Sequence, residues 1–422
     1  MAGLFPENHG IVGNVFHDQE HNNKIYDYWG FGRNATVRNW SRDENWYLNG
    51  VPIYFLNGGT AESRRIAGRR TGCQRWVTCD RRSSVYSVHF VRSKSLHECL
   101  YGNLTARKAN FDTLFELFQH PTKPINLGLF YICEPDTVQQ NHDINGPVVS
   151  AKLREIDGLF GYILDKVDAA ATYNLDQKLN IIFLSDHGHT SVPIPENLIV
   201  LDEVVPKEEQ AQLRFQSAEW SFVAADGTGQ RSKSYWDSLF LRLSNYQKNT
   251  NGPYAIYRKG DPKLIQFHWI VPDRVGEVIL LAKSGYKVVW NRSISDYLAM
   301  YPGEKIVGNH GYTNEDNAMN GVFAARGPAF KTPNTINREF LNVDVYPLLA
   351  HVLKLKPGPN NGSIHTFSKV LIASPPLLAQ SVKDSTNYNM IITLQMVITC
   401  LAIIAQSVKE QEMGRPEATV VK

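Results

Sequence analysis

Three short segments of the sequence carry carboxylates and imidazoles that could hold metal ions. Asp186 and His187 directly follow the apolar run "IIFL", and His310 stands between two glycines. With the segment "EPDTVQQNH" included, the candidate ligands are Asp136, His142, Asp186, His187 and His310. Zinc takes carboxylates and neutral imidazoles as ligands. Five ligands exceed what one catalytic zinc needs, whereas two ions about 4 Å apart would use them and could clamp a phosphoryl group.

Each of these segments also has an ordinary structural explanation. An aspartate at a strand end, such as Asp136, usually caps a helix. A histidine between glycines, such as His310, can be a turn residue. One segment alone is therefore a weak indication of a metal site.

The pattern around these residues predicts the elements that would position them. Residues 125–133 and 180–186 read as buried strands, and the apolar positions of 152–167 follow one helical face. This order predicts an α/β fold with a mostly parallel central sheet covered by helices. Ligands of such sheets bind beyond the carboxyl ends of the strands. Asp136 and the Asp186-His187 pair each follow a strand, so we expect them at one edge.

Later segments fit the same fold. The pattern predicts a strand over 321–330 and a helix over 343–357 that ends at Pro357. The mixed stretch between residues 200 and 300 indicates an inserted α+β segment.

The composition excludes few classes of protein. The chain has 422 residues, of which 43% are hydrophobic, and a net charge of +3. This charge gives no support for binding a nucleic acid polymer. The basic stretch 64–82 reads as a solvated loop. Five Asn-X-Ser/Thr sequons favour an oxidising, extracellular compartment.

The two ends of the chain suggest a membrane protein. Residues 390–405 carry no charge, and they follow a loose segment and precede a polar tail. We therefore predict a linker over 373–388, a transmembrane helix over 389–408 and a cytoplasmic tail over 409–422. This predicts a single-pass protein of the cell membrane with an extracellular domain over 1–372. The first residues are no signal peptide, so we hypothesise that the amino-terminal part is missing.

Taken together, the segments resemble the nucleotide pyrophosphatase/phosphodiesterase family of the alkaline phosphatase-like superfamily. "CEPD", a histidine and "GP" stand in the order of the family's "EEPD", histidine and "GP". "SDHGH" and "HGY" match its "SDHGM" and "HGY", and "GLFPENHGI", "ARGPAF" and "NVDVYPLL" match further segments. The resemblance covers residues 1 to about 365.

The resemblance implies a zinc-dependent phosphoric diester hydrolase with two zinc ions and a nucleotide or other phosphodiester as its small-molecule substrate. Asp136, His142 and His310 would hold one zinc ion, and Asp186 and His187 the other. The family's threonine nucleophile and a further aspartate belong upstream of residue 1, together with the first strand region. No catalytic residue can therefore be assigned, the second zinc site is incomplete, and we expect no turnover by the chain as written.

Three residues are candidates for binding the substrate. Tyr101 lies at the spacing of the tyrosine on which the family stacks a nucleobase, and a partly buried core tyrosine is the equal alternative. Trp76 and Asp80 of "RWVTCD" match the family's "MWPGSD", from which the proline and glycine are lost.

Two departures from the family pattern leave other functions open. Asp136 and His142 are six residues apart where the family has four, and His189 replaces a methionine, a change that we interpret as harmless. The altered spacing favours an inactive homologue that acts as a cell-surface binding ectodomain. A sulfatase or phosphomonoesterase of the same superfamily is a third possibility, against which the "GLFPENHG" and "ARGPAF" matches count.

Overall fold

The structure is a computed structural model in which most of the chain is described. The described residues are 2–18, 24–27, 50, 53, 56, 88–91, 104–121, 125–170, 175, 177–216, 221–224, 231–271, 273–290, 293–331, 336, 339–372, 390–395 and 419–421.

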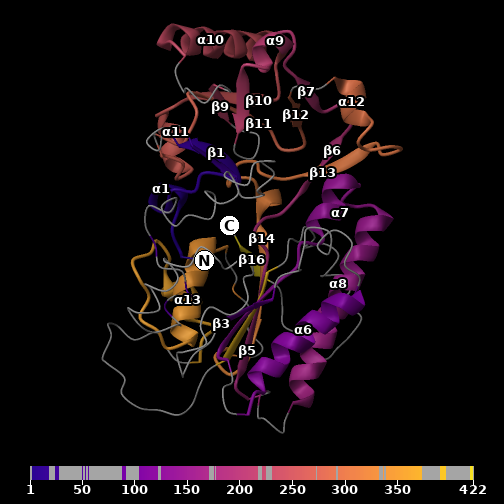
Figure 1. The fold of residues 1–422 in the computed structure, drawn as a ribbon, viewed down its shortest axis with the longest axis vertical. Coiled ribbons are helices and arrows are strands. Elements are labelled where there is room, and N and C mark those ends of the chain that lie inside the picture. The colour runs from indigo at the N-terminus through magenta and orange to yellow at the C-terminus, as the bar shows by residue number, and fades with distance from the viewer. Residues whose placement is uncertain are drawn as a thin grey trace.

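Six described strands form a sheet at the centre of the protein (Figure 1). Their order in the sheet is β16-β14-β5-β15-β4-β3. Its strands are β3 (Val88–Val91), β4 (Leu127–Tyr131), β5 (Leu179–Leu184), β14 (Gly321–Arg326), β15 (Met390–Gln395) and β16 (Thr419–Val421). The neighbours β3, β4, β15 and β5 run parallel, and β14 is antiparallel to both β5 and β16. The predicted α/β class with a mostly parallel sheet is confirmed. The strands predicted over 125–133 and 180–186 are confirmed as β4 and β5.

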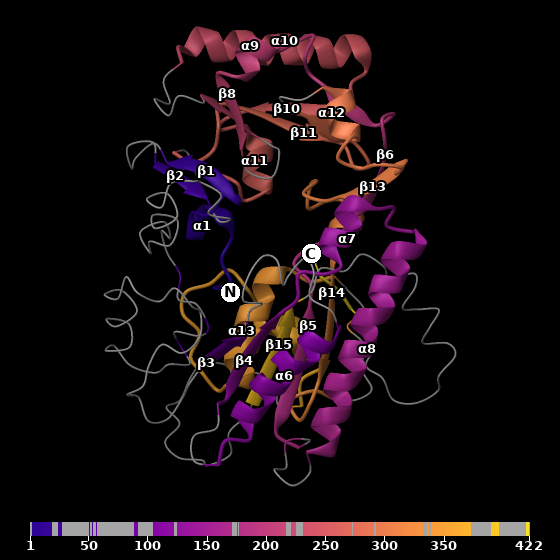
Figure 2. The same cartoon turned by 45° about the vertical axis from the view of Figure 1, so that its right-hand side comes forward.

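Helices cover both faces of this sheet (Figure 2), which explains why its strands are mostly apolar. On one face lie α6 (Leu104–Phe118) and α8 (Pro147–Ala169), and on the other α13 (Val345–Val352). Successive residues of β5 face opposite layers: Ile181 and Phe183 pack in the cluster of α6 and α8, and Ile182 and Leu184 in that of α13. The predicted helix over 152–167 is part of α8, and the helix predicted over 343–357 ends earlier than expected.

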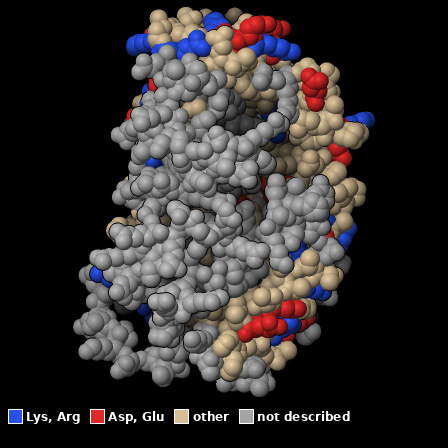
Figure 3. Space-filling view, in the orientation of Figure 1, with Lys and Arg blue, Asp and Glu red and all other residues tan. Residues whose placement is uncertain are grey.

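The α+β insertion predicted between residues 200 and 300 lies beyond one end of the sheet. It has a four-stranded sheet of order β10-β11-β9-β8 and a long helix, α10, that packs Leu239 and Leu243 against it. Its elements are β7 (Leu198–Val200), α9 (Lys207–Gln210), β8 (Leu213–Gln216), β9 (Ser221–Ala224), α10 (Lys233–Thr250), β10 (Tyr254–Arg258), α11 (Pro262–Gln266), β11 (Val278–Ala282), β12 (Lys287–Val289) and α12 (Ile294–Leu298). Over α9 and α10, described charges of both signs are mixed on the face shown in Figure 3.

The amino-terminal segment packs against this insertion. Its helix and hairpin are α1 (Pro6–His9), β1 (Val15–Asp18) and β2 (Lys24–Asp27). Val12 and Phe16 form a core with Leu264, Val275 and Ile279 of the insertion. The short elements that remain are α7 (Asp136–Asn141), β6 (Thr190–Pro193), β13 (Ile306–Asn309), η3 (Asn317–Met319), η4 (Asn342–Asp344) and η5 (Ile364–Phe367).

The prediction of a single-pass membrane protein is wrong for the part of the chain that the structure describes. No helix among the described residues is long and apolar enough to cross a bilayer. Residues 390–395, which we placed in a transmembrane helix, form β15 between β4 and β5. A central strand covered on both faces needs the same freedom from charge as a membrane helix, so the uncharged run did not discriminate between them. The predicted linker and most of the predicted tail lie outside the described residues.

Candidate metal centre

The first candidate ligand, Asp136, begins the short helix α7 just after β4. One helical turn later, Gln140 lies on the same face of α7, because residues four apart are neighbours on a helix. Its Nε2 donates a hydrogen bond to Asp136 Oδ1 over 2.8 Å and lies 3.0 Å from Nε2 of His310. Gln140 therefore orients the carboxylate toward the histidines.

The segment after β5 brings the next two candidates to the same edge of the sheet. His187 donates from Nδ1 to the carbonyl oxygen of Gly188 over 3.0 Å, which leaves the lone pair on Nε2 for a ligand bond. Gly188 allows this turn because a Cβ atom there would lie 2.1 Å from the carbonyl oxygen of Ala318. Asp186 Oδ1 lies 3.8 Å from Nε2 of His187.

Two further histidines meet because β6 and β13 pair in antiparallel register. Thr190 lies opposite Asn309, so His189 before β6 and His310 after β13 come next to each other. Their ring centroids are 4.8 Å apart. The ring of His187 stacks on that of His310 at 3.8 Å.

Together, α7, the segment after β5 and the β6–β13 pairing produce a compact set of metal-ligand atoms. Asp136, His187, His189 and His310 each offer one ligand atom, and all four atoms lie within 4.8 Å of one another. Oδ1 of Asp136 is 3.1 Å from Nε2 of His189 and 3.4 Å from Nε2 of His310. Of the five ligands predicted from the sequence, the structure thus brings three together and adds His189, which sequence reasoning passed over. The signal was a second histidine two residues after His187, where an extended chain returns to the same side.

Burial keeps the imidazoles of His189 and His310 neutral. Desolvation, helped by the other histidines, lowers the pKa of His310 to about 2. Desolvation also lowers the pKa of His189, although Asp136 opposes this shift. For Asp136, burial acts to raise the pKa, but His189 and the other imidazoles outweigh it and hold the pKa below its ordinary value. Neutral imidazoles beside a carboxylate are in the protonation states that a metal ion requires.

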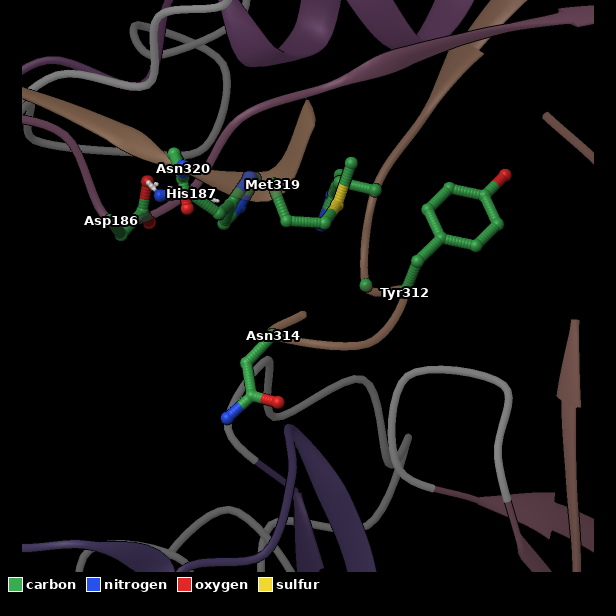
Figure 4. A pocket seen from close by; sticks show the side chains of 8 residues that line it. Asp186, His187, Tyr312, Asn314, Met319 and Asn320 are labelled. Atoms are coloured by element: carbon green, nitrogen blue, oxygen red, sulfur yellow. Dashed lines mark hydrogen bonds and ion pairs between the residues drawn. The ribbon is translucent and has the colours of Figure 1, made fainter. Parts of the chain in front are cut away.

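A solvent-open pocket of about 210 Å³ borders the donor set. Its wall includes Asp186, His187 and His310 on the ligand side. Asn314 faces these residues from across the cavity (Figure 4). Burial raises the pKa of Asp186, and the carboxylate of Asp136 adds to the shift while His187 opposes it. Because the pocket is small and open, the reacting group of a larger ligand could lie in it beside the histidines while the rest of the ligand stays outside.

The fifth predicted ligand, His142, lies outside the donor set. It follows α7 in an extended conformation, and its Nδ1 lies 2.7 Å from Oε1 of Glu304. The altered spacing explains this position: four residues after Asp136 the chain has Gln140, and a residue six positions along projects from a different side. The metal-binding roles of all five residues stay predictions.

The predicted substrate-binding residues Tyr101, Trp76 and Asp80 lie outside the described residues, so their roles also stay predictions.

A family model for type I phosphodiesterase / nucleotide pyrophosphatase matches residues 1–313 of the chain. The protein belongs to this family. Ectonucleotide pyrophosphatase/phosphodiesterase family member 5 of Homo sapiens is 27% identical over 379 residues, which are 89% of this chain and 68% of the relative. Bis(5'-adenosyl)-triphosphatase ENPP4 of Homo sapiens is 28% identical over 420 residues, which are 96% of this chain and 78% of the relative.

Solved structures of family member 5 have the same fold. The human structure superposes with a TM-score of 0.63 at 23% identity and covers 88% of this chain and 86% of its own. An inactive murine variant in complex with AMP superposes with a TM-score of 0.64 at 22% identity, and covers 88% of this chain and 85% of its own. The alkaline phosphatase-like fold expected from the sequence is thereby confirmed.

Proposed function

We propose that the protein is a metal-dependent hydrolase of phosphodiester or pyrophosphate bonds in nucleotides. The observation that carries this proposal is the convergence of a carboxylate and three imidazoles, Asp136, His187, His189 and His310. Two of them, His187 and His310, line an open pocket. Family membership supports the reaction type. The AMP held by a structural relative supports a nucleotide as the substrate.

The donor set fits zinc. Three nitrogen donors and one oxygen donor form a borderline-soft set of the kind zinc prefers, in contrast to the all-oxygen sites of calcium and magnesium. A bound zinc ion would polarise a phosphoryl oxygen and lower the pKa of bound water. The two-zinc arrangement that the family resemblance implies remains a prediction, and it needs His142 to leave Glu304.

The side chains of the pocket have separate roles in this proposal. Gln140 fixes the orientation of the Asp136 carboxylate, and the hydrogen bond to Gly188 fixes the tautomer of His187. Asn314 offers an amide to the substrate on the opposite wall. Asn320 donates to Glu339 over 3.0 Å, so its side chain is held at the rim. The threonine nucleophile of the family mechanism is not assigned to any residue.

The position of His142 favours a second candidate, a homologue that binds nucleotides without hydrolysing them. If the ion pair with Glu304 persists, a ligand that the resemblance assigns is withheld from the centre. Turnover separates the two functions, because both predict binding in the pocket.

The test is hydrolysis of a chromogenic nucleotide phosphodiester with added zinc, together with binding of AMP. The resemblance led us to expect no turnover by the chain as written, whereas the hydrolase proposed here predicts turnover. His187→Ala should lower that turnover by at least about 100-fold, as loss of a catalytic group commonly does. Lys233→Ala is the control because its side chain is 91% exposed on α10. Binding of AMP without turnover would support the binding ectodomain. Absence of both would overturn the two candidates.

A further inference from the structure

We infer that His189 completes a four-ligand site for one divalent cation of the zinc class, with Asp136, His187 and His310 as the other ligands. The inference rests on the proposed function, because it concerns the same pocket. It differs from what the family resemblance implies, which divides Asp136 and His187 between two ions and gives His189 no role. It gives residue 189 a ligand role where the family pattern has methionine.

The spacing of three donor atoms, those of Asp136, His189 and His310, approaches that of one tetrahedral ion. Zinc–nitrogen and zinc–oxygen bonds of about 2.0–2.2 Å place neighbouring ligand atoms of a tetrahedron roughly 3.3–3.6 Å apart. Oδ1 of Asp136 lies 3.1 Å from Nε2 of His189 and 3.4 Å from Nε2 of His310. All four ligand atoms lie within 4.8 Å of one another, so one ion would draw the widest pair together by about 1 Å. It would also displace the Gln140 amide from Asp136 and His310.

The environment of His189 favours a metal ion as the partner of its imidazole ring. Its side chain is 0% exposed. Within the described part of the chain, Nδ1 makes no hydrogen bond, and Nε2 has only the close approach to Oδ1 of Asp136 at 3.1 Å. A buried polar group without a partner costs about 1–3 kcal/mol. A metal ion would satisfy one nitrogen and remove much of that cost.

The surrounding elements hold the four ligands from independent directions. The β6–β13 pairing fixes His189 and His310, the turn at Gly188 fixes His187, and α7 delivers Asp136. Ligands on different elements whose positions are set by backbone pairing form a pre-organised site. An ordinary buried histidine would need one hydrogen bond and would not require three other donors within 4.8 Å.

Asp186 lies beside this site rather than in it. Its carboxylate borders the pocket and is 3.8 Å from His187. One ion held by four protein ligands leaves Asp186 free to contact substrate or water. The inference therefore predicts one tightly bound ion per chain.

Cobalt(II) is the probe, because its visible absorption reports four-coordinate geometry. The metal-free protein is titrated with Co²⁺, and zinc affinity is measured by competition. We expect one ion per chain and a tetrahedral spectrum. Loss of an outer-shell partner already costs roughly 10–100-fold in metal affinity, so His189→Met should cost at least about 100-fold. His365→Ala is the matched control and should leave both affinity and spectrum unchanged, because His365 is exposed on η5 and belongs to no candidate site.

His189→Cys keeps the test valid if His189→Met fails to fold. A thiolate bound to Co²⁺ produces a sulfur-to-metal charge-transfer band that appears only if residue 189 is a ligand. The inference is overturned if His189→Met binds Co²⁺ as the unaltered protein does, or if His189→Cys binds it without the new band. Phosphodiester turnover is measured on the same samples. Metal binding through residue 189 without turnover would count against the proposed function alone, and turnover with metal binding independent of residue 189 would count against this inference alone.

Discussion

Nε of Arg274 donates a hydrogen bond to Oδ2 of Asp18 over 2.8 Å, with the two side chains only 2% and 1% exposed. The guanidinium also donates to the carbonyl oxygen of Gly10 over 2.6 Å and lies 5.4 Å from the ring centre of Phe16. This ion pair joins the end of β1 to the inserted segment.

Removing one partner of this buried pair should strongly destabilise the protein. Asp18→Asn leaves the Arg274 charge buried without its counter-charge, which typically costs about 3–5 kcal/mol. Asp168→Asn is the matched control, because Asp168 pairs with Arg326 at 2.6 Å but the side chains are 48% and 40% exposed. That exposed pair should contribute less than about 1 kcal/mol. Denaturant unfolding of both variants measures the difference, and equal losses would refute the assignment of Asp18–Arg274 as a structural anchor.

Gly308 should control how closely α7 approaches β13. A Cβ atom at this position would lie 2.3 Å from the carbonyl oxygen of Gln139. Gly308→Ala must push α7 away, which should cost at least about 2 kcal/mol and separate Asp136 from His310. The free energy of unfolding and the zinc affinity should therefore both fall.

The control for this variant is Gly161→Ala in α8, where a Cβ atom meets nothing within 4 Å. Alanine favours a helix over glycine by about 0.5–1 kcal/mol, so this variant should be slightly more stable than the unaltered protein. Retention of full zinc affinity by Gly308→Ala would show that the spacing of α7 and β13 does not position the ligands.

The half-buried His9 should make stability depend on pH. Burial, with the positive charge of Arg274 adding to it, lowers the pKa of His9 to about 4. Its Nδ1 accepts a hydrogen bond from the amide of Ile11, which requires the neutral ring. The unfolded chain protonates near pH 6.5 and the folded one near 4, so this contribution is present above 6.5 and is lost as the pH falls toward 4. The loss is on the order of 2–3 kcal/mol.

The variant His9→Asn isolates this contribution, because the amide oxygen can accept the same hydrogen bond without titrating. Denaturant unfolding is measured from pH 7.5 to 4.5 for both proteins. We expect the difference in stability to shift in favour of the variant as the pH falls. Parallel curves would mean that His9 does not supply the pH dependence.

The strand β15 should contribute to the stability of the central sheet. Ile392 pairs with Gly128 of β4 and with Ile181 of β5. A proline there removes a ladder hydrogen bond inside the sheet, and we expect a loss of at least about 2 kcal/mol. Val420→Pro is the control, since among the described strands β16 pairs with β14 alone. Thermal unfolding that is equally affected by both prolines would contradict a central position for β15.

The fold was predictable where local pattern and tertiary environment agree. The apolar run of β5 is long and continuous, and the helical face of Ile156, Leu159 and Ile163 in α8 recurs at the helical period. Residues 390–395 were misread because freedom from charge was weighted above composition. The segment "MIITLQ" contains β-branched residues that favour a strand, and sequence alone did not indicate which partner strands were available.

The candidate site was predictable in part for a related reason. Asp136, His187 and His310 follow strands, so topology alone predicts a common edge. His189 was dismissed because it was compared with a family residue rather than with its neighbours in space. Its proximity to His310 depends on the register of β6 against β13, which no short motif specifies. The position of His142 depends on α7 being helical, since an extended loop of the same length could have returned it to the site.

The central place of β15 has a consequence for biosynthesis. Leu127 of β4 pairs with Ile391, and Leu179 of β5 pairs with Met390. The strand that lies between β4 and β5 is therefore synthesised long after both of them. Until then, the nascent chain exposes two unpaired strand edges, which are templates for association with other chains. We therefore expect the emerging polypeptide to rely on chaperones that shield those edges, and slowed translation of the last third of the message to lower the yield of folded protein.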